Sequence, residues 1–276
     1  SACLVGSEMC IRDRDTKEHT DMSVLKIQTV DKLTVKVYST RDEMGRAAAA
    51  EAAAAIKAAI AEKGEINMIF AAAPSQNEFL SYLIADKGID FSKINAFHMD
   101  EYIGLASDAP QGFANFLRER LFDRVPFASV NTIDSSADPQ AECDRYGALL
   151  KAHPCDIVCM GIGENGHIAF NDPPVADFND PAAVKVVALD EICRRQQVND
   201  GCFASIGDVP THALTLTVPT LVSAKKVFCI VPAPTKANAV KAALTGDVST
   251  ACPASILRRH PDAILYCDAD SAKYIL

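Results

Sequence analysis

Short apolar runs alternate with longer helical stretches along most of the chain. Residues 33–38 alternate apolar and polar positions, and residues 226–231 form a nearly continuous apolar run; both patterns are typical of strands. The alanine-rich stretch 43–62 is typical of a helix, and Thr40 with Glu43 forms a capping-box pattern in front of it. This alternation of strands and helices indicates an α/β fold.

The same alternation continues to the C-terminus. We expect further strands at 66–73, 91–99, 131–133, 156–160, 184–189, 212–218 and 263–267, and the stretch 191–205 is irregular or briefly helical. Strands that follow one another through helices pair in parallel, and the helices cover the faces of the sheet. We therefore predict a mainly parallel, open, Rossmann-like sheet with helices on both faces.

Polar loops follow the carboxyl ends of four of these strands. They carry Ser75, Asp100, His167 and Lys236. In an open α/β sheet the carboxyl ends of parallel strands share one edge, which is where ligands bind. We expect the four side chains to converge there, and their convergence indicates a site more strongly than any one residue does.

The most informative stretch is CDIVCMGIGENGHIAFNDPP at 155–174. A buried strand leads into Gly161, Gly163 and Gly166, which allow positive φ and let backbone approach a ligand closely. The spacing formally matches the dinucleotide-binding fingerprint. That fingerprint requires a long helix after the last glycine, whereas Pro173 follows within eight residues. The nucleotide interpretation is therefore weak.

The residue types in these loops suit acid–base chemistry on an anionic ligand. Asp100 and Asp172 supply carboxylates, and His167 titrates near neutral pH. Lys236 at the start of a helix suits a phosphate, because its ammonium and the free N–H groups act together. Ser75 either contributes to the same anion site or only caps the helix that follows.

Composition and charge narrow the class of protein. The net charge of −9 argues against a general nucleic-acid binder, and no apolar run reaches the ~18 residues that span a membrane. The ten cysteines lie mostly in apolar runs and include no Cys-x-x-Cys pair. We therefore expect reduced thiols, a cytoplasmic location, no zinc or other metal site, and no cofactor.

Two parts of the chain are expected to differ in order. Residues 1–32 mix charges with isolated apolar residues, show no clear period and lack the apolar segment of a secretory signal. We interpret them as an unstructured leader, and as a candidate translation artefact if the true start is Met22. Residues 33–276 are predicted to form a single α/β catalytic domain, a size that one core supports.

Two segments carry a resemblance to a known family. MDEYIG at 99–104 and GIGENGHIAFNDP at 161–173 are similar to the two signature segments of the glucosamine-6-phosphate deaminase/isomerase family. The resemblance runs from about Leu33 to the end of the chain. It implies a fold of the sugar-phosphate isomerase type and a phosphorylated amino sugar as ligand. The reaction implied is conversion of glucosamine 6-phosphate, or a close relative, to fructose 6-phosphate and ammonia.

The resemblance also implies roles for single residues. Asp100 matches the base that moves a proton between C2 and C1, and His167 matches the residue that opens the pyranose ring. Asn165 and Asp172 match positions that orient and tune His167. The substrate-binding positions implied are Ser75, Gln76, Gly166, Arg194 and Lys236.

The chain departs from the family pattern at several positions. Alanines at 71–73 stand where the family has a glycine-rich phosphate loop, and Asp172 stands where Glu is common. Asn165 occupies a position where some members have Asp. A phosphate-binding arginine expected near 194–203 cannot be aligned without a gap, so Arg194 and Arg195 are the candidates. These departures affect the choice of sugar more than the reaction class.

Two other functions stay open on the sequence alone. A 6-phosphogluconolactonase shares this fold and a similar glycine–histidine segment, but it has no need of the Asp100-Glu101-Tyr102 pattern. A sugar-phosphate sensor without turnover requires neither Asp100 nor His167, so their joint presence argues against it. Homo-oligomerisation is possible, and the sequence does not determine it.

Overall fold

The computed structural model describes residues 23–276. The first 22 residues of the expected leader therefore lie outside the described part of the chain. The remainder of that leader contains a strand, β1 (Val24–Val30), which pairs antiparallel with β2 (Leu33–Tyr38). The prediction of an unstructured segment up to residue 32 is thus wrong for β1. The strand lies at the edge of the sheet and buries none of its side chains fully, so it lacks the apolar face that would reveal it.

The main sheet is mostly parallel, as predicted. Its eight strands run in the order β1-β2-β11-β10-β7-β3-β4-β6, and every pair except β1–β2 is parallel. The strands not yet located are β3 (Ile66–Phe70), β4 (Ile94–His98), β6 (Ser129–Asn131), β7 (Ile157–Met160), β10 (Lys226–Val231) and β11 (Ala263–Asp268). The strands β10, β7, β3 and β4 are neighbours, and these four precede the polar loops identified in the sequence.

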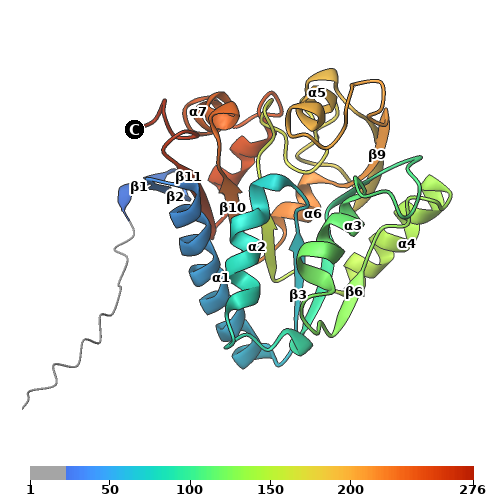
Figure 1. Cartoon of the computed structure of the whole chain (residues 1–276), viewed down its shortest axis with the longest axis horizontal. Helices are drawn as coiled ribbons and strands as arrows, with labels where there is room; N and C mark the ends of the chain where they lie inside the picture. The colour runs from blue at the N-terminus through green and yellow to red at the C-terminus, as the bar shows by residue number, and fades with distance from the viewer. Residues whose placement is uncertain (1–22) are drawn as a thin grey trace, which may run out of the picture.

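Helices cover both faces of this sheet, which confirms the predicted architecture (Figure 1). One face carries α1 (Arg41–Lys63), α2 (Asn77–Ala85) and α3 (Phe113–Leu117), and the other carries α4 (Pro139–Ala152), α6 (Val218–Val222) and α7 (Ala237–Thr245). Side chains of strand β7 alternate between the two faces, and each face is covered by an apolar core. Ile157 and Cys159 lie in the core with α1, α2 and α3, and Val158 and Met160 lie in the core with α4, α6 and α7. The capping box at Thr40 is present at the start of α1.

A second, smaller sheet was not foreseen. The strands β5 (Asp100–Tyr102), β9 (His212–Leu216) and β8 (Val184–Ala188) pair antiparallel in the order β5-β9-β8. The strand predicted at 91–99 is accordingly shorter, and the chain passes through Met99 from the main sheet into the small one. Asp100 thus lies at the point where the chain changes sheets.

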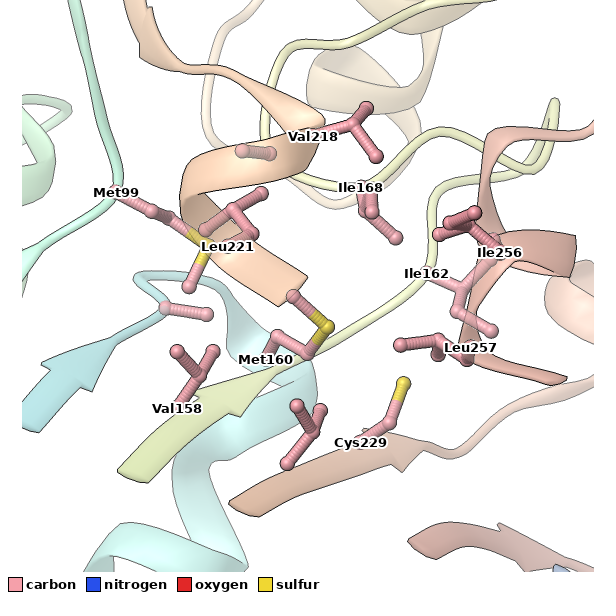
Figure 2. Close-up of a cluster of buried hydrophobic side chains, with 14 of the residues drawn as sticks. Met99, Val158, Met160, Ile162, Ile168, Val218, Leu221, Cys229, Ile256 and Leu257 are labelled. Carbon is pink, nitrogen blue, oxygen red and sulfur yellow. The ribbon is translucent and has the colours of Figure 1, made fainter. Parts of the chain in front are cut away.

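A buried apolar cluster anchors the loops at this edge (Figure 2). Met99, Ile162 and Ile168 lie in the loops after β4 and β7, and each is at most 5% exposed. They pack in the same cluster as Val158 and Met160 of β7. Full burial of such a side chain contributes about 1.5–3 kcal/mol. The apolar cluster therefore holds the backbone beside the candidate catalytic residues in place.

The remaining α-helix within residues 23–276 is α5 (Glu191–Asn199), in the stretch expected to be irregular or briefly helical. No described helix combines the length and the apolar character that a membrane crossing requires.

Candidate active site

A cavity lies at the carboxyl edge of the four neighbouring strands. Five residues predicted for the site line it, namely Ser75, Gln76, Asp100, His167 and Lys236. They come from the loops after β3, β4, β7 and β10. The expected convergence therefore occurs, because parallel strands that are adjacent in the sheet end at the same edge.

Asp100 is held in an environment that disfavours its charge. Its side chain is 7% exposed, and burial raises the pKa of this carboxyl well above its ordinary value; the neighbouring Glu101 raises it further. Such a carboxyl takes up and releases a proton closer to neutral pH than an ordinary aspartate does. This property suits a group that transfers protons.

Glu101, the next residue, hydrogen-bonds to backbone N–H groups. Its carboxylate accepts hydrogen bonds from the backbone N–H groups of Tyr102 and Phe113, each at 3.0 Å, and of Ala114 at 2.9 Å. Phe113 and Ala114 open α3, so Glu101 satisfies free donors at that helix N-terminus. Glu101 therefore fastens α3 to the strand that carries Asp100.

The imidazole of His167 is oriented by two neighbours in the same loop. Its Nδ1 lies 2.7 Å from Asn165 Oδ1 and 2.9 Å from Asp172 Oδ1. Asn165 Nδ2 also donates to Asp172 Oδ1 at 2.9 Å. With Nδ1 engaged in this way, Nε2 is the ring nitrogen left for a ligand in the cavity. Asn165 and Asp172 do not line the cavity and contact His167 instead.

Asp172 keeps its charge although it is fully buried. Burial by itself raises the pKa of Asp172, and the hydrogen bond and charge of His167 oppose this effect. Asn165 and the backbone N–H of Asp190 act in the same direction, so the pKa of Asp172 is lowered. An ionised Asp172 stabilises a positive charge on His167.

Two positions of the loop after β7 require glycine, each for a different reason. A Cβ on Gly163 would lie 2.1–2.4 Å from three atoms of the His167 ring, so only glycine allows the ring this position. Gly166 has a φ of 86°, and a Cβ there would lie 2.7 Å from Cys252 Sγ. Gly166 does not line the cavity; it shapes the turn that delivers His167.

Backbone in the left-handed region also occurs at two alanines that line the cavity. Ala169 has a φ of 48° and Ala233 a φ of 87°. For a residue with a Cβ this conformation costs roughly 1–2 kcal/mol. The Ala233 N–H donates to the Asp268 carboxylate, 3.0 Å from Oδ2, which compensates part of that cost.

The cationic end of the cavity is formed by the loops after β3 and β10. Lys236 is 5% exposed, and burial lowers the pKa of its ammonium. Among residues 23–276 no carboxylate lies close enough to form a salt bridge with Lys236, although Asp200 and Glu164 act on it at longer range. In the loop after β3, Gln76 Nε2 donates to Ser75 Oγ at 3.0 Å and to the carbonyl of Ile230 at 3.2 Å, which links this loop to β10.

The structure gives Arg194 a different place from the one the sequence suggested. Its Nη2 donates to the carbonyls of Ile206 at 2.7 Å and Val209 at 2.9 Å, and Arg194 does not line the cavity. Arg195 points to solvent and pairs with Glu191. Neither arginine of this segment is therefore positioned as an anion ligand; Arg194 holds the loop after α5.

Other residues that the sequence pattern did not indicate also line the cavity, and Arg41 is the most significant. Its guanidinium hydrogen-bonds the carbonyl of Pro74 and pairs with Glu78, 2.8 Å from Nε to Oε2. Arg41 begins α1, and its neighbour in the sequence, Thr40, signalled only a helix cap. Thr235, Gln196, Gln197 and Asp200 also line the cavity. The last three lie on or directly after α5, which the sequence pattern described too vaguely to assign a face.

One cluster of potential metal ligands lies behind the cavity. His167 Nδ1, a carboxylate oxygen of Asp172 and the thiol of Cys193 all lie within 4.8 Å of one another. The proton-transfer chemistry that the cavity suits does not involve Cys193.

Taken together, the cavity offers a carboxyl of raised pKa, an imidazole backed by a carboxylate, and two cationic side chains, the buried Lys236 ammonium and the Arg41 guanidinium. This set can hold an anionic group at one end and move protons on a carbon skeleton at the other.

Comparisons with known proteins give a consistent result. The sequence model of the family described as glucosamine-6-phosphate isomerases/6-phosphogluconolactonase matches residues 39–265. The glucosamine-6-phosphate deaminase of Exiguobacterium sibiricum is 39% identical over 188 residues, which cover 68% of this chain and 73% of the relative. The glucosamine-6-phosphate deaminase of Listeria innocua is 34% identical over 213 residues, which cover 77% of this chain and 89% of the relative.

Solved structures show the same relationship. A monomeric glucosamine-6-phosphate deaminase superposes with a TM-score of 0.79 at 32% identity, covering 87% of this chain and 98% of that one. A 6-phosphogluconolactonase from Shewanella baltica superposes with a TM-score of 0.71 at 18% identity, covering 88% and 98% of the two chains. At that lower identity the likeness establishes the fold alone.

Proposed function

Because the chain belongs to the glucosamine-6-phosphate isomerase/6-phosphogluconolactonase family of enzymes, we propose that it is a glucosamine-6-phosphate deaminase. It converts glucosamine 6-phosphate, or a close relative, to fructose 6-phosphate and ammonia. The observation that carries this proposal is the single cavity shared by Asp100, His167 and Lys236. A proton-transfer base, a ring-opening group and a phosphate-binding cation are the three elements that the reaction requires.

Ring opening is the task of His167. Nε2 accepts the proton of the C1 hydroxyl and then donates a proton to the ring oxygen as the bond between C1 and that oxygen breaks. The product is the open-chain aldehyde with its ammonium group on C2. The transient positive charge on the imidazole is stabilised by Asp172, whose oxygen lies 2.9 Å from Nδ1.

Proton transfer from C2 to C1 is the task of Asp100. Its carboxylate removes the C2 proton and returns it to C1. One proton of the ammonium group is given up and the aldehyde oxygen takes up one proton, so that C1 becomes an alcohol and C2 an iminium carbon. Water then adds to C2 and ammonia leaves, so that C2 ends as the ketone. C1 is reduced and C2 oxidised within one molecule, so no external oxidant or reductant is needed.

The substrate itself helps to ionise the base. Asp100 has a raised pKa in the empty cavity, whereas a base must be deprotonated. The amino sugar brings a positive charge into the same cavity, and a nearby cation favours the carboxylate form. Binding of the amino sugar therefore lowers the pKa of Asp100 at the stage when the base is required.

Phosphate binding is assigned to Lys236, with Ser75 and Arg41 of the same cavity as further candidates. Lys236 has no salt-bridge partner within the described chain, so a phosphate would be its first close counter-ion. Ser75 lies in the 3₁₀ turn Pro74–Gln76 that follows β3. Arg41 supplies a guanidinium to the cavity, whereas the family resemblance implied one near residue 194.

The reaction class is tested by supplying purified protein with glucosamine 6-phosphate and, in parallel, with 6-phosphogluconolactone. We expect ammonia and fructose 6-phosphate to form in equal amounts from the amino sugar. Lactone hydrolysis without ammonia release would assign the chain to the lactonase branch of the family. No turnover of either compound, with the sugar phosphate still raising Tm, would make the protein a binding protein instead.

A further inference from the structure

Three side chains of the types that bind metal ions lie close together behind the cavity. Cys193 comes from α5, whereas His167 and Asp172 come from the loop after β7. Their donor atoms lie within 4.8 Å of one another, and the three side chains are only 1%, 7% and 0% exposed, respectively. The backbone N–H of Asp190, at the N-cap of α5, donates to Asp172 Oδ2 at 3.2 Å. This hydrogen bond ties the start of the helix to the loop.

The donor set selects a particular class of ion. A thiolate, an imidazole and a carboxylate suit Zn²⁺ and similar divalent transition metals, whereas Mg²⁺ and Ca²⁺ prefer oxygen ligands. Ligand atoms about 2.0–2.3 Å from a tetrahedral Zn²⁺ lie about 3.3–3.6 Å apart. His167 Nδ1 and Asp172 Oδ1, now 2.9 Å apart, need to separate by only a few tenths of an ångström. Asn165 Oδ1, 2.7 Å from Nδ1, or a water molecule can complete the tetrahedron.

The surrounding charges also favour a cation. Asp100, Asp172 and Asp190 all act electrostatically on the Cys193 thiol. A divalent ion in the cluster would be stabilised by Asp172, whose lowered pKa keeps it ionised and whose charge opposes a free thiolate there.

We propose that His167, Asp172 and Cys193 form an inhibitory site for Zn²⁺ or a chemically similar transition-metal ion. This ion is not a cofactor, since the proton transfers described above are carried by side chains alone. It is a ligand that competes with the catalytic arrangement of His167.

The inhibition follows from proton balance. Before binding, the thiol of Cys193 is protonated, Asp172 is ionised and His167 carries its proton on Nδ1. When the metal binds to Nδ1, that proton moves to Nε2 and the thiol proton is released to solvent. The net change is uptake of one divalent ion and release of one proton. Nε2 then becomes a donor and can no longer accept the C1 hydroxyl proton; this consequence rests on the proposed deaminase function.

Binding is measured first, on metal-free full-length protein, by titration with Co²⁺ and detection of the sulfur-to-cobalt charge-transfer absorption. We expect this absorption in the wild type and its loss in Cys193→Ala and Cys193→Ser. Affinity should fall by at least about a hundredfold, because loss of even outer-shell partners of a metal costs about 10–100-fold. Cys202→Ala is the matched control: Cys202 is a more exposed thiol just after α5, and its removal should leave the absorption unchanged.

Inhibition is measured second, as ammonia release with increasing Zn²⁺ or Mg²⁺, each variant relative to its own metal-free rate. We expect Zn²⁺ to inhibit the wild type and Cys202→Ala, Mg²⁺ to have no effect, and Cys193→Ser to resist Zn²⁺. Persistence of the cobalt–sulfur absorption in Cys193→Ala, or its absence from the wild type, would overturn the proposal. If no ammonia is released without metal, the deaminase assignment fails, but the cobalt titration still decides whether the site exists.

Discussion

The loop after β4 and the loop after β7 each bring a buried aspartate to the same site, and the two carboxylates have opposite pKa shifts. Asp100 is 7% exposed, and burial and then Glu101 raise its pKa. Asp172 is even more buried, yet the hydrogen bond and charge of His167 lower its pKa against the effect of burial. Burial alone therefore does not decide the charge of either group.

The difference comes from the donors around each carboxylate. Asp172 accepts hydrogen bonds from Asn165 and from the backbone N–H of Asp190, and it faces His167 at 2.9 Å. Within residues 23–276 no comparable donor acts on Asp100, whose pKa is raised by burial and by the neighbouring Glu101. Two aspartates on neighbouring loops are thereby suited to two tasks, one exchanging protons with substrate and one keeping a permanent charge behind the imidazole.

The largest expected effect is loss of turnover when the proton-exchanging carboxylate is removed. Asp100→Asn should lower kcat by about 10²–10⁴, the usual contribution of a positioned base, and the protein should remain folded. Asp108→Asn, a change at an exposed aspartate in the following loop, is the control and should have wild-type kcat. Near wild-type turnover in Asp100→Asn would remove Asp100 from the mechanism.

A smaller loss is expected at the other carboxylate, which acts only through His167. Asp172→Asn removes a charged partner of the imidazole, worth about 1.5–3 kcal/mol, so kcat should fall by about 10–100-fold. KM for glucosamine 6-phosphate should change little, because Asp172 does not line the cavity. A raised KM with unchanged kcat would show that Asp172 contributes to binding instead.

Removal of the buried lysine should affect KM more than kcat, the reverse of the effect expected at Asp172. Lys236→Ala should raise KM for the phosphorylated sugar by about tenfold, equivalent to about 1.4 kcal/mol, with a lesser effect on kcat. Lys241→Ala on the exposed face of α7 is the matched control. If KM is the same in both variants, the phosphate binds elsewhere.

The smallest effect is on stability, and its sign should differ between the two aspartates. The folded-state pKa of Asp100 is raised, so its contribution is full below the unfolded pKa of about 3.9 and is lost as pH rises through the folded value. The folded-state pKa of Asp172 is lowered, so its contribution is present above about pH 3.9 and is lost as pH falls through the folded value.

The Tm of each variant relative to wild type should follow these signs. The Tm of Asp100→Asn should rise relative to wild type as pH increases from about 4. The Tm of Asp172→Asn should fall relative to wild type as pH rises toward about 4 from below, and the difference should stay constant above that pH. Each change of about 1 kcal/mol corresponds to about 2–4 °C in a protein of this size. Parallel pH dependence in the two variants would contradict the assigned pKa directions.

Much of the fold was predictable because it depends on local pattern and simple geometry. Apolar runs that alternate with helical stretches imply a parallel sheet, and parallel strands place their following loops at one edge. This is why the sequence alone predicts that Asp100, His167 and Lys236 lie in one site. The edge strand β1 was not predicted because it buries no apolar face. The small sheet was not predicted because antiparallel pairing of strands that are distant in the sequence has no local signature.

The candidate site was predicted less completely than the fold. Arg41 precedes the other cavity residues in the chain and lies at the start of a long helix, where its sequence context indicates only a cap. Arg194 was chosen for its residue type, but two backbone carbonyls of the next loop occupy its guanidinium. Which side of α5 faces the cavity depends on how the helix packs, and periodicity over nine residues does not fix that.

The most direct test of the central claim follows the C2–H bond itself. Glucosamine 6-phosphate carrying deuterium at C2 is incubated with wild type and with Asp100→Asn, and loss of the label from C2 is followed by NMR. We expect the wild type to transfer deuterium from C2 to C1 or to solvent as fructose 6-phosphate forms. In Asp100→Asn the label should stay on C2. Undiminished loss of deuterium in Asp100→Asn would contradict the assignment of Asp100 as the base.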